Sequence, residues 1–202
     1  MARKVEQLNK YGLSRNIPTE VKRTIRRRCG FGCVVCGNAI VTYEHIDPVY
    51  ADAREHDPEC MTLLCGGCQL ESTKGTLSKK TIKAANNSPF CKRAGHAKHI
   101  FDLGGKRPKL LLGGNDFTDC GQMIRVDGET LFEIEPPERL SSRWRLSATF
   151  RNSNGDILCE IIENELKLNP DNFDIEQTAR IFRVKSCDGS CVTSNAGPNG
   201  DA

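Results

Sequence analysis

The 202-residue sequence contains no apolar run that approaches the roughly 20 residues needed to cross a bilayer. Its first residues, Met1 to Glu6, lead into no apolar signal core. The sequence also lacks the motifs of phosphate-binding loops, dinucleotide-binding folds, serine hydrolases and Cys/His proteases. These absences argue against a membrane protein and against those enzyme classes, and they predict a cytoplasmic location.

Cysteine, in contrast, is abundant, with 11 residues. Four of them form two Cys-x-x-Cys pairs with 28 residues between the pairs. Each pair presents two thiolates from a tight turn, and two such pairs complete a tetrahedral zinc site. In a reducing compartment this spacing indicates a metal rather than disulfides. The sequence therefore predicts a structural Zn²⁺ ion bound by Cys33, Cys36, Cys65 and Cys68.

The overall net charge of +3 conceals an uneven distribution. Residues 1–99 carry 17 Lys and Arg against 9 Asp and Glu, whereas residues 100–202 carry 12 against 17. A basic half is expected to meet a polyanion, and DNA is the predicted partner. The acidic half leaves open a protein partner or oligomerisation through the C-terminal β domain. A solvated charged surface would produce the same bias.

In the first half, apolar residues recur every four positions between Pro18 and Gly30, which predicts an amphipathic helix. Side chains alternate over residues 40–46, which predicts a strand. Two further helices are expected over residues 69–74 and 78–87. Four cations flank the cysteine pairs and are candidate contacts to nucleic-acid phosphates: Arg26, Arg27, Arg28 and Lys74.

In the second half the apolar pattern changes to a period of two, which predicts a small antiparallel β domain. Asp127-Gly128 and Asn154-Gly155 lie where type I′ hairpin turns are expected. The strand candidates are residues 109–112, 123–126, 130–134, 146–151, 157–162 and 180–185.

Between the cysteine pairs lies the run Tyr43-Glu44-His45-Ile46-Asp47-Pro48, followed by Thr62-Leu63-Leu64 before the second pair and by Lys74 after it. This combination resembles the motif of HNH endonucleases of the zinc-knuckle type, over roughly residues 18–80. In that family two strands and a helix bind one divalent cation, and a histidine at the end of the first strand is the general base. The resemblance implies that His45 is the base. It also implies that Glu44 and Gln69 bind the catalytic cation, Mg²⁺ or another divalent ion.

The chemistry agrees with these roles, because phosphodiester hydrolysis needs a base with a pKa near neutrality and a cation that neutralises charge on the phosphate. By spacing, however, the family's asparagine falls on Cys60 and its last histidine falls on Gln69. A thiol cannot replace the hydrogen bonds of an amide. His56 is either a second imidazole of the site or a surface histidine. Two functions stay open: a metal-dependent HNH endonuclease acting on DNA, or a catalytically degenerate HNH-fold zinc module that binds nucleic acid or a protein partner without cutting.

The expected fold class is α+β, with an N-terminal ββα-metal HNH-like zinc domain followed by a small antiparallel β domain. The predicted organisation is a flexible arm over residues 1–17, the zinc and nucleic-acid-binding domain over 18–87, a linker over 88–108, the antiparallel β domain over 109–186 and a disordered tail over 187–202.

Overall fold

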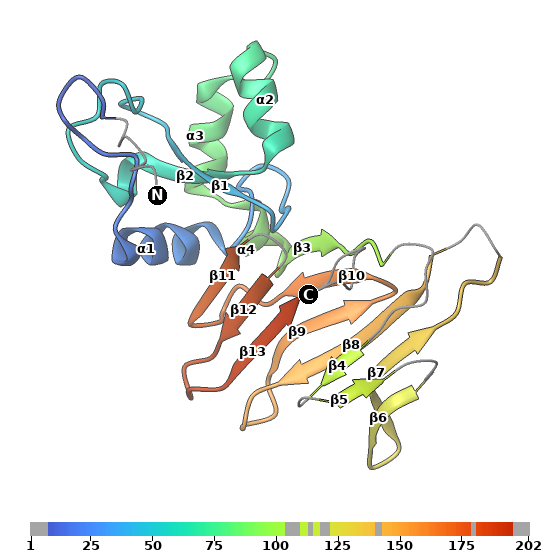
Figure 1. The fold of residues 1–202 in the computed structure, drawn as a ribbon. Coiled ribbons are helices and arrows are strands. Elements are labelled where there is room, and N and C mark those ends of the chain that lie inside the picture. Colours follow the sequence, from blue (N-terminus) through green and yellow to red (C-terminus); the bar gives the residue numbers. More distant parts are fainter. Residues whose placement is uncertain are drawn as a thin grey trace, which may run out of the picture. The chain divides into compact units, whose positions relative to one another are not determined.

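The computed structural model describes residues 8–103, 110–112, 115–117, 122–139, 143–178 and 181–195. The chain divides after Ala97 into two compact units, residues 1–97 and 98–202 (Figure 1). The expected fold class is confirmed in its coarse form, because the protein mixes helices with mostly antiparallel sheets and carries a cysteine cluster. Within the described ranges, no helix combines the length and apolar character needed to cross a membrane.

The first unit is built around a short hairpin. Strands β1 (Thr42–His45) and β2 (Met61–Leu64) pair antiparallel, so that Glu44 lies opposite Thr62 and His45 opposite Met61. Every residue of β2 is buried, and α2 follows it after a single residue. The helices of this unit are α1 (Thr19–Cys29), the 3₁₀ helix η1 (Pro58–Cys60), α2 (Gly66–Lys74), α3 (Lys79–Asn87) and α4 (Phe90–Ala94).

Local sequence signals explain where these helices begin and end. Gly30 adopts a left-handed conformation with φ 70° and closes α1, as the sequence predicted. Ser78 accepts a hydrogen bond from the Thr81 N–H at 3.1 Å and caps α3. The apolar faces of the helices meet the hairpin in one core, whose fully or nearly fully buried members include Ile25, Val34, Met61, Leu63 and Ile82.

The N-terminal segment differs from the expected flexible arm over its described part, residues 8–17. The Asn9 amide donates to the carbonyls of Tyr50 and Ala53, both at 2.7 Å, and the Tyr50 hydroxyl donates to the Leu13 carbonyl at 2.7 Å. These bonds join a polar segment to a distant loop, so that no apolar periodicity is needed to order it. Residues 1–7 lie outside the described part of the chain.

The second unit consists of antiparallel sheets. A six-stranded sheet has the order β3-β10-β9-β8-β7-β6, a three-stranded sheet has the order β11-β12-β13, and β4 pairs with β5. The strands are β3 (Ala97–Ile100), β4 (Leu110–Leu112), β5 (Asn115–Phe117), β6 (Gln122–Val126), β7 (Glu129–Glu135), β8 (Arg145–Arg151), β9 (Ile157–Ile162), β10 (Glu165–Leu168), β11 (Asp174–Thr178), β12 (Ile181–Lys185) and β13 (Cys191–Asn195).

The six predicted strands match β4, β6, β7, β8, β9 and β12, with Lys109 and Arg180 outside the described residues. Two predicted segments differ from the structure. The described part of the expected linker, residues 88–103, forms α4 and β3, and the expected disordered tail contains β13, whose Val192 pairs with Val184. Both segments are polar. β3 pairs with β10, which is distant in the sequence, whereas β13 pairs with β12, the strand directly before it.

The turns agree with the sequence in one case and differ in another. Asp127 and Gly128 have φ angles of 50° and 85°, as a type I′ turn requires. At Asn154-Gly155 only the glycine has a positive φ, because the Asn152 side chain accepts from the N–H groups of Asn154 and Asp156, both at 2.9 Å, and sets a longer loop.

The turn beside the first cysteine pair gives a testable prediction. Gly37 has a φ of 80°, and a Cβ atom there would lie 2.5 Å from the Phe90 ring. Gly37→Ala should lower the free energy of unfolding by roughly 2–4 kcal/mol, from left-handed backbone strain and overpacking. Chemical denaturation of the zinc-loaded protein measures it. The control is Gly66→Ala, where no atom lies within 4 Å; equal stability of the two variants would contradict the prediction.

Candidate functional site

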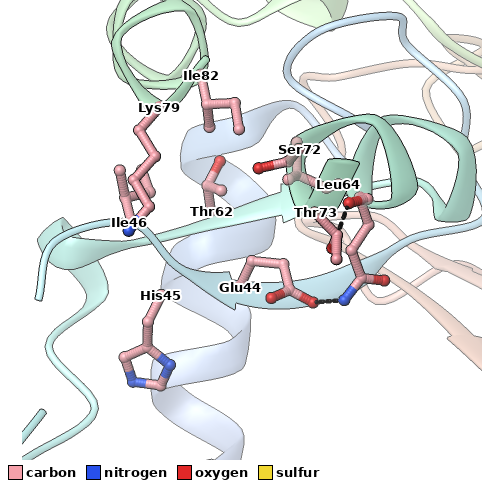
Figure 2. A pocket seen from close by; sticks show the side chains of 10 residues that line it. Glu44, His45, Ile46, Thr62, Leu64, Ser72, Thr73, Lys79 and Ile82 are labelled. Carbon is pink, nitrogen blue, oxygen red and sulfur yellow. Dashed lines mark hydrogen bonds between the residues drawn. The ribbon is translucent and has the colours of Figure 1, made fainter. Parts of the chain in front are cut away.

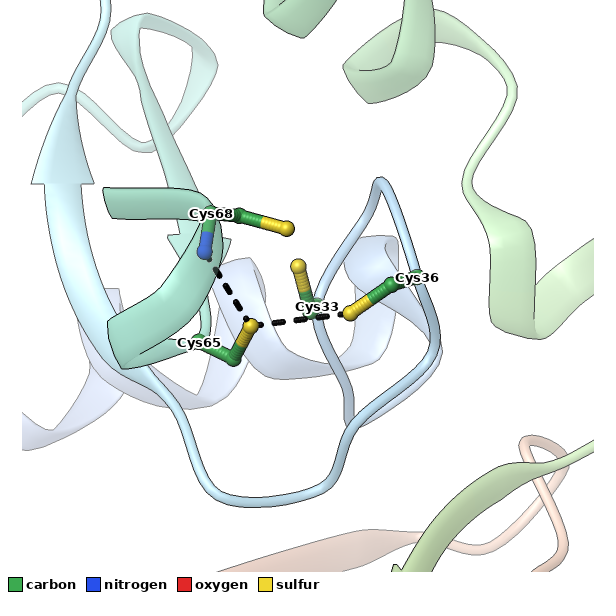
Figure 3. A group of neighbouring side chains, drawn as sticks. All are labelled: Cys33, Cys36, Cys65 and Cys68. Atoms are coloured by element: carbon green, nitrogen blue, oxygen red, sulfur yellow. Dashed lines mark hydrogen bonds between the residues drawn. The ribbon is translucent and has the colours of Figure 1, made fainter. Parts of the chain in front are cut away.

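Four cysteine side chains of the first unit converge on one point (Figure 3). Their sulfur atoms all lie within 4.8 Å of one another, and those of Cys36 and Cys65 are 3.5 Å apart. A tetrahedral ion with Zn–S bonds of roughly 2.3 Å requires sulfur–sulfur distances of roughly 3.8 Å. The structure thus brings together the predicted ligands Cys33, Cys36, Cys65 and Cys68, which can hold a metal ion such as zinc.

Backbone hydrogen bonds shape the turn around each cysteine pair. The Cys33 carbonyl accepts a hydrogen bond from the Gly37 N–H at 2.8 Å, which closes the first turn. Cys65 is the N-cap of α2, and its sulfur accepts from the Cys68 N–H at 3.5 Å. Each pair therefore presents its two sulfurs from a hydrogen-bonded turn, as zinc-binding knuckles require.

The electrostatics of the cluster favour a cation. Burial, with the nearby Cys33 sulfur adding to it, raises the pKa of Cys36 to about 11 and also raises the pKa of Cys68. Burial acts in the same direction on Cys65, but hydrogen bonds from the Cys68 N–H and the Cys36 thiol lower its pKa overall. Four thiolates this close repel one another, and a divalent cation removes that repulsion.

A second group of side chains lies at the hairpin. Glu44 on β1 and Gln69 on α2 are in contact, with the Gln69 amide donating to a Glu44 carboxylate oxygen. Both line a cavity of about 110 Å³, together with Thr62 and Lys79 (Figure 2). Burial raises the pKa of Glu44. Rotation of the Gln69 amide would present its carbonyl oxygen beside the carboxylate, and two oxygen ligands suit a hard cation such as Mg²⁺.

His45 follows Glu44 on β1, and its side chain points away from the Glu44 carboxylate (Figure 2). Adjacent residues on a strand face opposite sides, so this divergence is the expected result of the strand geometry. The imidazole instead approaches His56, with the His45 Nε2 and His56 Nδ1 atoms 3.3 Å apart. Burial and the charge of His56 lower the pKa of His45, which favours the neutral imidazole, the form that can accept a proton.

Two other cysteines near these groups have different surroundings. Cys29 is fully buried at the end of α1. The Cys60 thiol donates to Asp57 Oδ2 at 3.3 Å, and the Cys60 carbonyl accepts from the Ile46 N–H at 2.8 Å. Position 60 therefore supports the end of β1 through its backbone, and its side chain is engaged by an aspartate.

The predicted nucleic-acid contacts fall into two environments. Arg26 is buried and donates to the Tyr43 hydroxyl at 2.7 Å. Arg28 donates to the Met61 carbonyl and also approaches Glu59 at 3.1 Å. Both guanidinium groups thus support the packing of α1. The exposed residues of the predicted set are Arg27 and Lys74.

Sequence reasoning did not assign Arg15 and Tyr50 to the site. The Arg15 guanidinium lies 4.5 Å from the centroid of the Tyr50 ring, and the positive charge of Arg15 acts to lower the pKa of Glu44. The Tyr50 ring centroid is 5.6 Å from that of His45. No periodicity could have identified these residues, because they come from polar loops that approach β1 only in the folded chain.

The cysteine cluster predicts one tightly bound zinc ion per chain. Cys65→Ser should abolish stoichiometric zinc and unfold the first unit, because structural zinc sites supply folding free energy directly. Metal analysis by mass spectrometry together with circular dichroism measures both effects.

The matched control is Cys191→Ser, at an exposed thiol of the second unit, which should keep both zinc and fold. Zinc affinity should also rise with pH, because the raised pKa values of Cys36 and Cys68 leave protons that zinc must displace. Zinc retained by Cys65→Ser at full stoichiometry would disprove the assignment.

No family model, curated protein or solved structure matches this chain. Any function assigned to it therefore rests on the geometry and chemistry of its own residues.

Proposed function

We propose that the first unit is a metal-dependent HNH-type endonuclease that hydrolyses phosphodiester bonds in DNA, with a structural zinc ion. The observation that carries the proposal is that strand β1 bears both a candidate cation ligand, Glu44, and a candidate general base, His45. Glu44 meets Gln69 on one side of β1, and His45 lies on the other side with a neutral imidazole. A β-hairpin followed directly by a helix is also the arrangement that the HNH resemblance implies.

In this mechanism His45 removes a proton from a water molecule, and the resulting hydroxide attacks the phosphorus atom. The phosphorus–oxygen bond to the leaving group breaks, and the leaving oxygen takes up a proton from solvent water. A divalent cation held by Glu44 and Gln69 would supply charge neutralisation at the phosphate. Histidine suits the base role because its unperturbed pKa is close to 6.5 and burial lowers that of His45.

The charge of the first half supports DNA as the substrate. The exposed cations Arg27 and Lys74 fit phosphate contacts, which fix the position of a duplex without reading its sequence. The charge of Arg15 acts on Glu44, and Lys79 lines the same cavity as Glu44. Binding carried by such contacts weakens as the salt concentration rises.

Cleavage gives the direct test. Purified protein incubated with supercoiled plasmid and Mg²⁺, Mn²⁺ or Ni²⁺ should nick or linearise it, and His45→Ala should lower the rate by roughly 100-fold or more, because general-base catalysis contributes on that scale. Gel electrophoresis of timed samples measures the rate.

His96→Ala is the matched control, because His96 belongs to the same unit, lies 3.1 Å from the Ala94 carbonyl oxygen through its Nδ1 atom, and does not line the cavity beside Glu44. It should cleave like the unsubstituted protein. Plasmid that stays intact with all three metals, or cleavage that survives His45→Ala, would refute the proposal.

A second candidate is a degenerate HNH-fold module that binds nucleic acid, or a protein partner, without cutting. The observation that favours it concerns positions 60 and 69, where the HNH resemblance would place an asparagine and a histidine. Both side chains present there form hydrogen bonds within the protein. Gln69 donates to Glu44, and the Cys60 thiol donates to Asp57. A neutral amide at position 69 also binds a cation more weakly than a histidine or carboxylate.

Restoring the family residues separates the two candidates. Cys60→Asn with Gln69→His should raise the cleavage rate at limiting Mn²⁺ by roughly 10-fold if the centre is an active but weakened nuclease, a typical effect of an added metal ligand. A filter-binding assay measures DNA affinity in parallel. Salt-sensitive DNA binding with no cleavage before or after restoration would identify the binding module instead.

A further inference from the structure

The His56 imidazole bridges His45 and the N-terminal segment. The His56 Nε2 atom lies 2.8 Å from the Ser14 carbonyl oxygen, and its Nδ1 atom lies 3.3 Å from Nε2 of His45. The two rings have centroids 5.3 Å apart. Both nitrogens of this half-buried side chain are therefore engaged, unlike those of an ordinary surface histidine.

The hydrogen-bond directions fix the tautomers of both neutral rings. A carbonyl oxygen only accepts, so Nε2 of His56 must carry its proton. The Nδ1 atom of neutral His56 then has a lone pair and accepts a hydrogen bond. Nε2 of His45 is consequently the donor, and the lone pair of His45 lies on Nδ1. This assignment follows from the Ser14 carbonyl for the state in which both imidazoles are neutral.

We propose that His56 is a positioning residue for His45, which holds the imidazole in the Nε2–H tautomer and leaves Nδ1 as its basic nitrogen. The inference rests on the proposed function for its role in catalysis, but the tautomer itself does not depend on activity. A general base is effective only when its lone pair faces the proton that it removes, and the partner of the other ring nitrogen sets that orientation.

The loop that carries His56 is itself held in place. The Tyr50 hydroxyl donates to the Leu13 carbonyl at 2.7 Å, and the Asn9 amide donates to the Tyr50 and Ala53 carbonyls at 2.7 Å. The segment that provides the Ser14 carbonyl is thus tied to the loop at three further points. His56 is therefore oriented before any substrate binds, as positioning by a second shell of hydrogen bonds requires.

Two isosteric variants separate positioning from simple structural support. His56→Asn places an amide oxygen near the Nδ1 position, which keeps an acceptor for His45 and loses the bond to Ser14. His56→Gln places an amide nitrogen near the Nε2 position, which keeps the bond to Ser14 and loses the acceptor. His56→Phe keeps the ring shape and loses both. Thermal unfolding of each variant shows whether the fold is retained.

In plasmid cleavage, the ranking of the variants by kcat should depend on whether each retains a hydrogen-bond acceptor for His45. His56→Asn should keep kcat within roughly 3-fold, whereas His56→Gln and His56→Phe should lose roughly 10- to 100-fold in kcat with KM unchanged within roughly 2-fold, a typical effect of removing a positioning hydrogen bond. The reverse order, with Gln active and Asn inactive, or unchanged kcat in all variants, would overturn the proposal.

Long-range ¹H–¹⁵N NMR of the imidazoles in the full chain gives a readout that needs no activity. His45 should be the Nε2–H tautomer in the unsubstituted protein and in His56→Asn, and it should shift toward a mixture in His56→Gln. An Nδ1–H tautomer of His45 in the unsubstituted protein would overturn the proposal. If no DNA is cleaved, this measurement still decides the tautomer, so that failure of the nuclease and failure of the positioning role are distinguishable.

Discussion

The convergence of four cysteine sulfurs, which can hold a metal ion such as zinc, is the constraint on which the first unit depends. Cys33, Cys65 and Cys68 are themselves buried members of the apolar core. The candidate metal ligands and the core of the first unit are therefore packed together. The Val34 N–H donates to the Leu63 carbonyl at 3.1 Å and joins the first cysteine turn to β2. Without a cation this core would enclose repelling or protonated thiols, and the ordering of the turn, the strand and α2 is thereby coupled to metal binding.

The same constraint determines where the polar groups of the site lie. Gln69 directly follows the ligand Cys68, so fixing the start of α2 also fixes the amide that meets Glu44. β1 is held against β2 in a register that places His45 opposite Met61. The cysteine cluster therefore sets the distance between the two halves of the proposed catalytic centre, although none of its ligands takes part in the proposed chemistry.

The parts of this structure that the sequence predicted are those set by short-range patterns. The four-cysteine cluster needs only two-residue spacings, and α1 needs only a repeat of four with Gly30 at its end. The parts that it did not predict depend on long-range partners. His56 meets a carbonyl 42 residues earlier in the chain. The β9–β10 turn uses Glu163 and Asn164 at positive φ without a glycine. Asn164 is held there by hydrogen bonds with Leu146 and Trp144, 18 and 20 residues earlier in the chain.

The position of His45 and Glu44 on opposite sides of β1 constrains the proposed reaction. A phosphate can meet both only at the end of the strand, where the chain turns into the loop that carries His56. The proposed cation site has one carboxylate and a neutral amide. The charge of Arg15 acts on Glu44, and Lys79 lines the same cavity. These cations oppose a divalent ion in the free protein, whereas a bound phosphate would offset them and add oxygen ligands. On the proposed function, metal binding at Glu44 is therefore coupled to DNA binding, and the catalytic cation enters with its substrate.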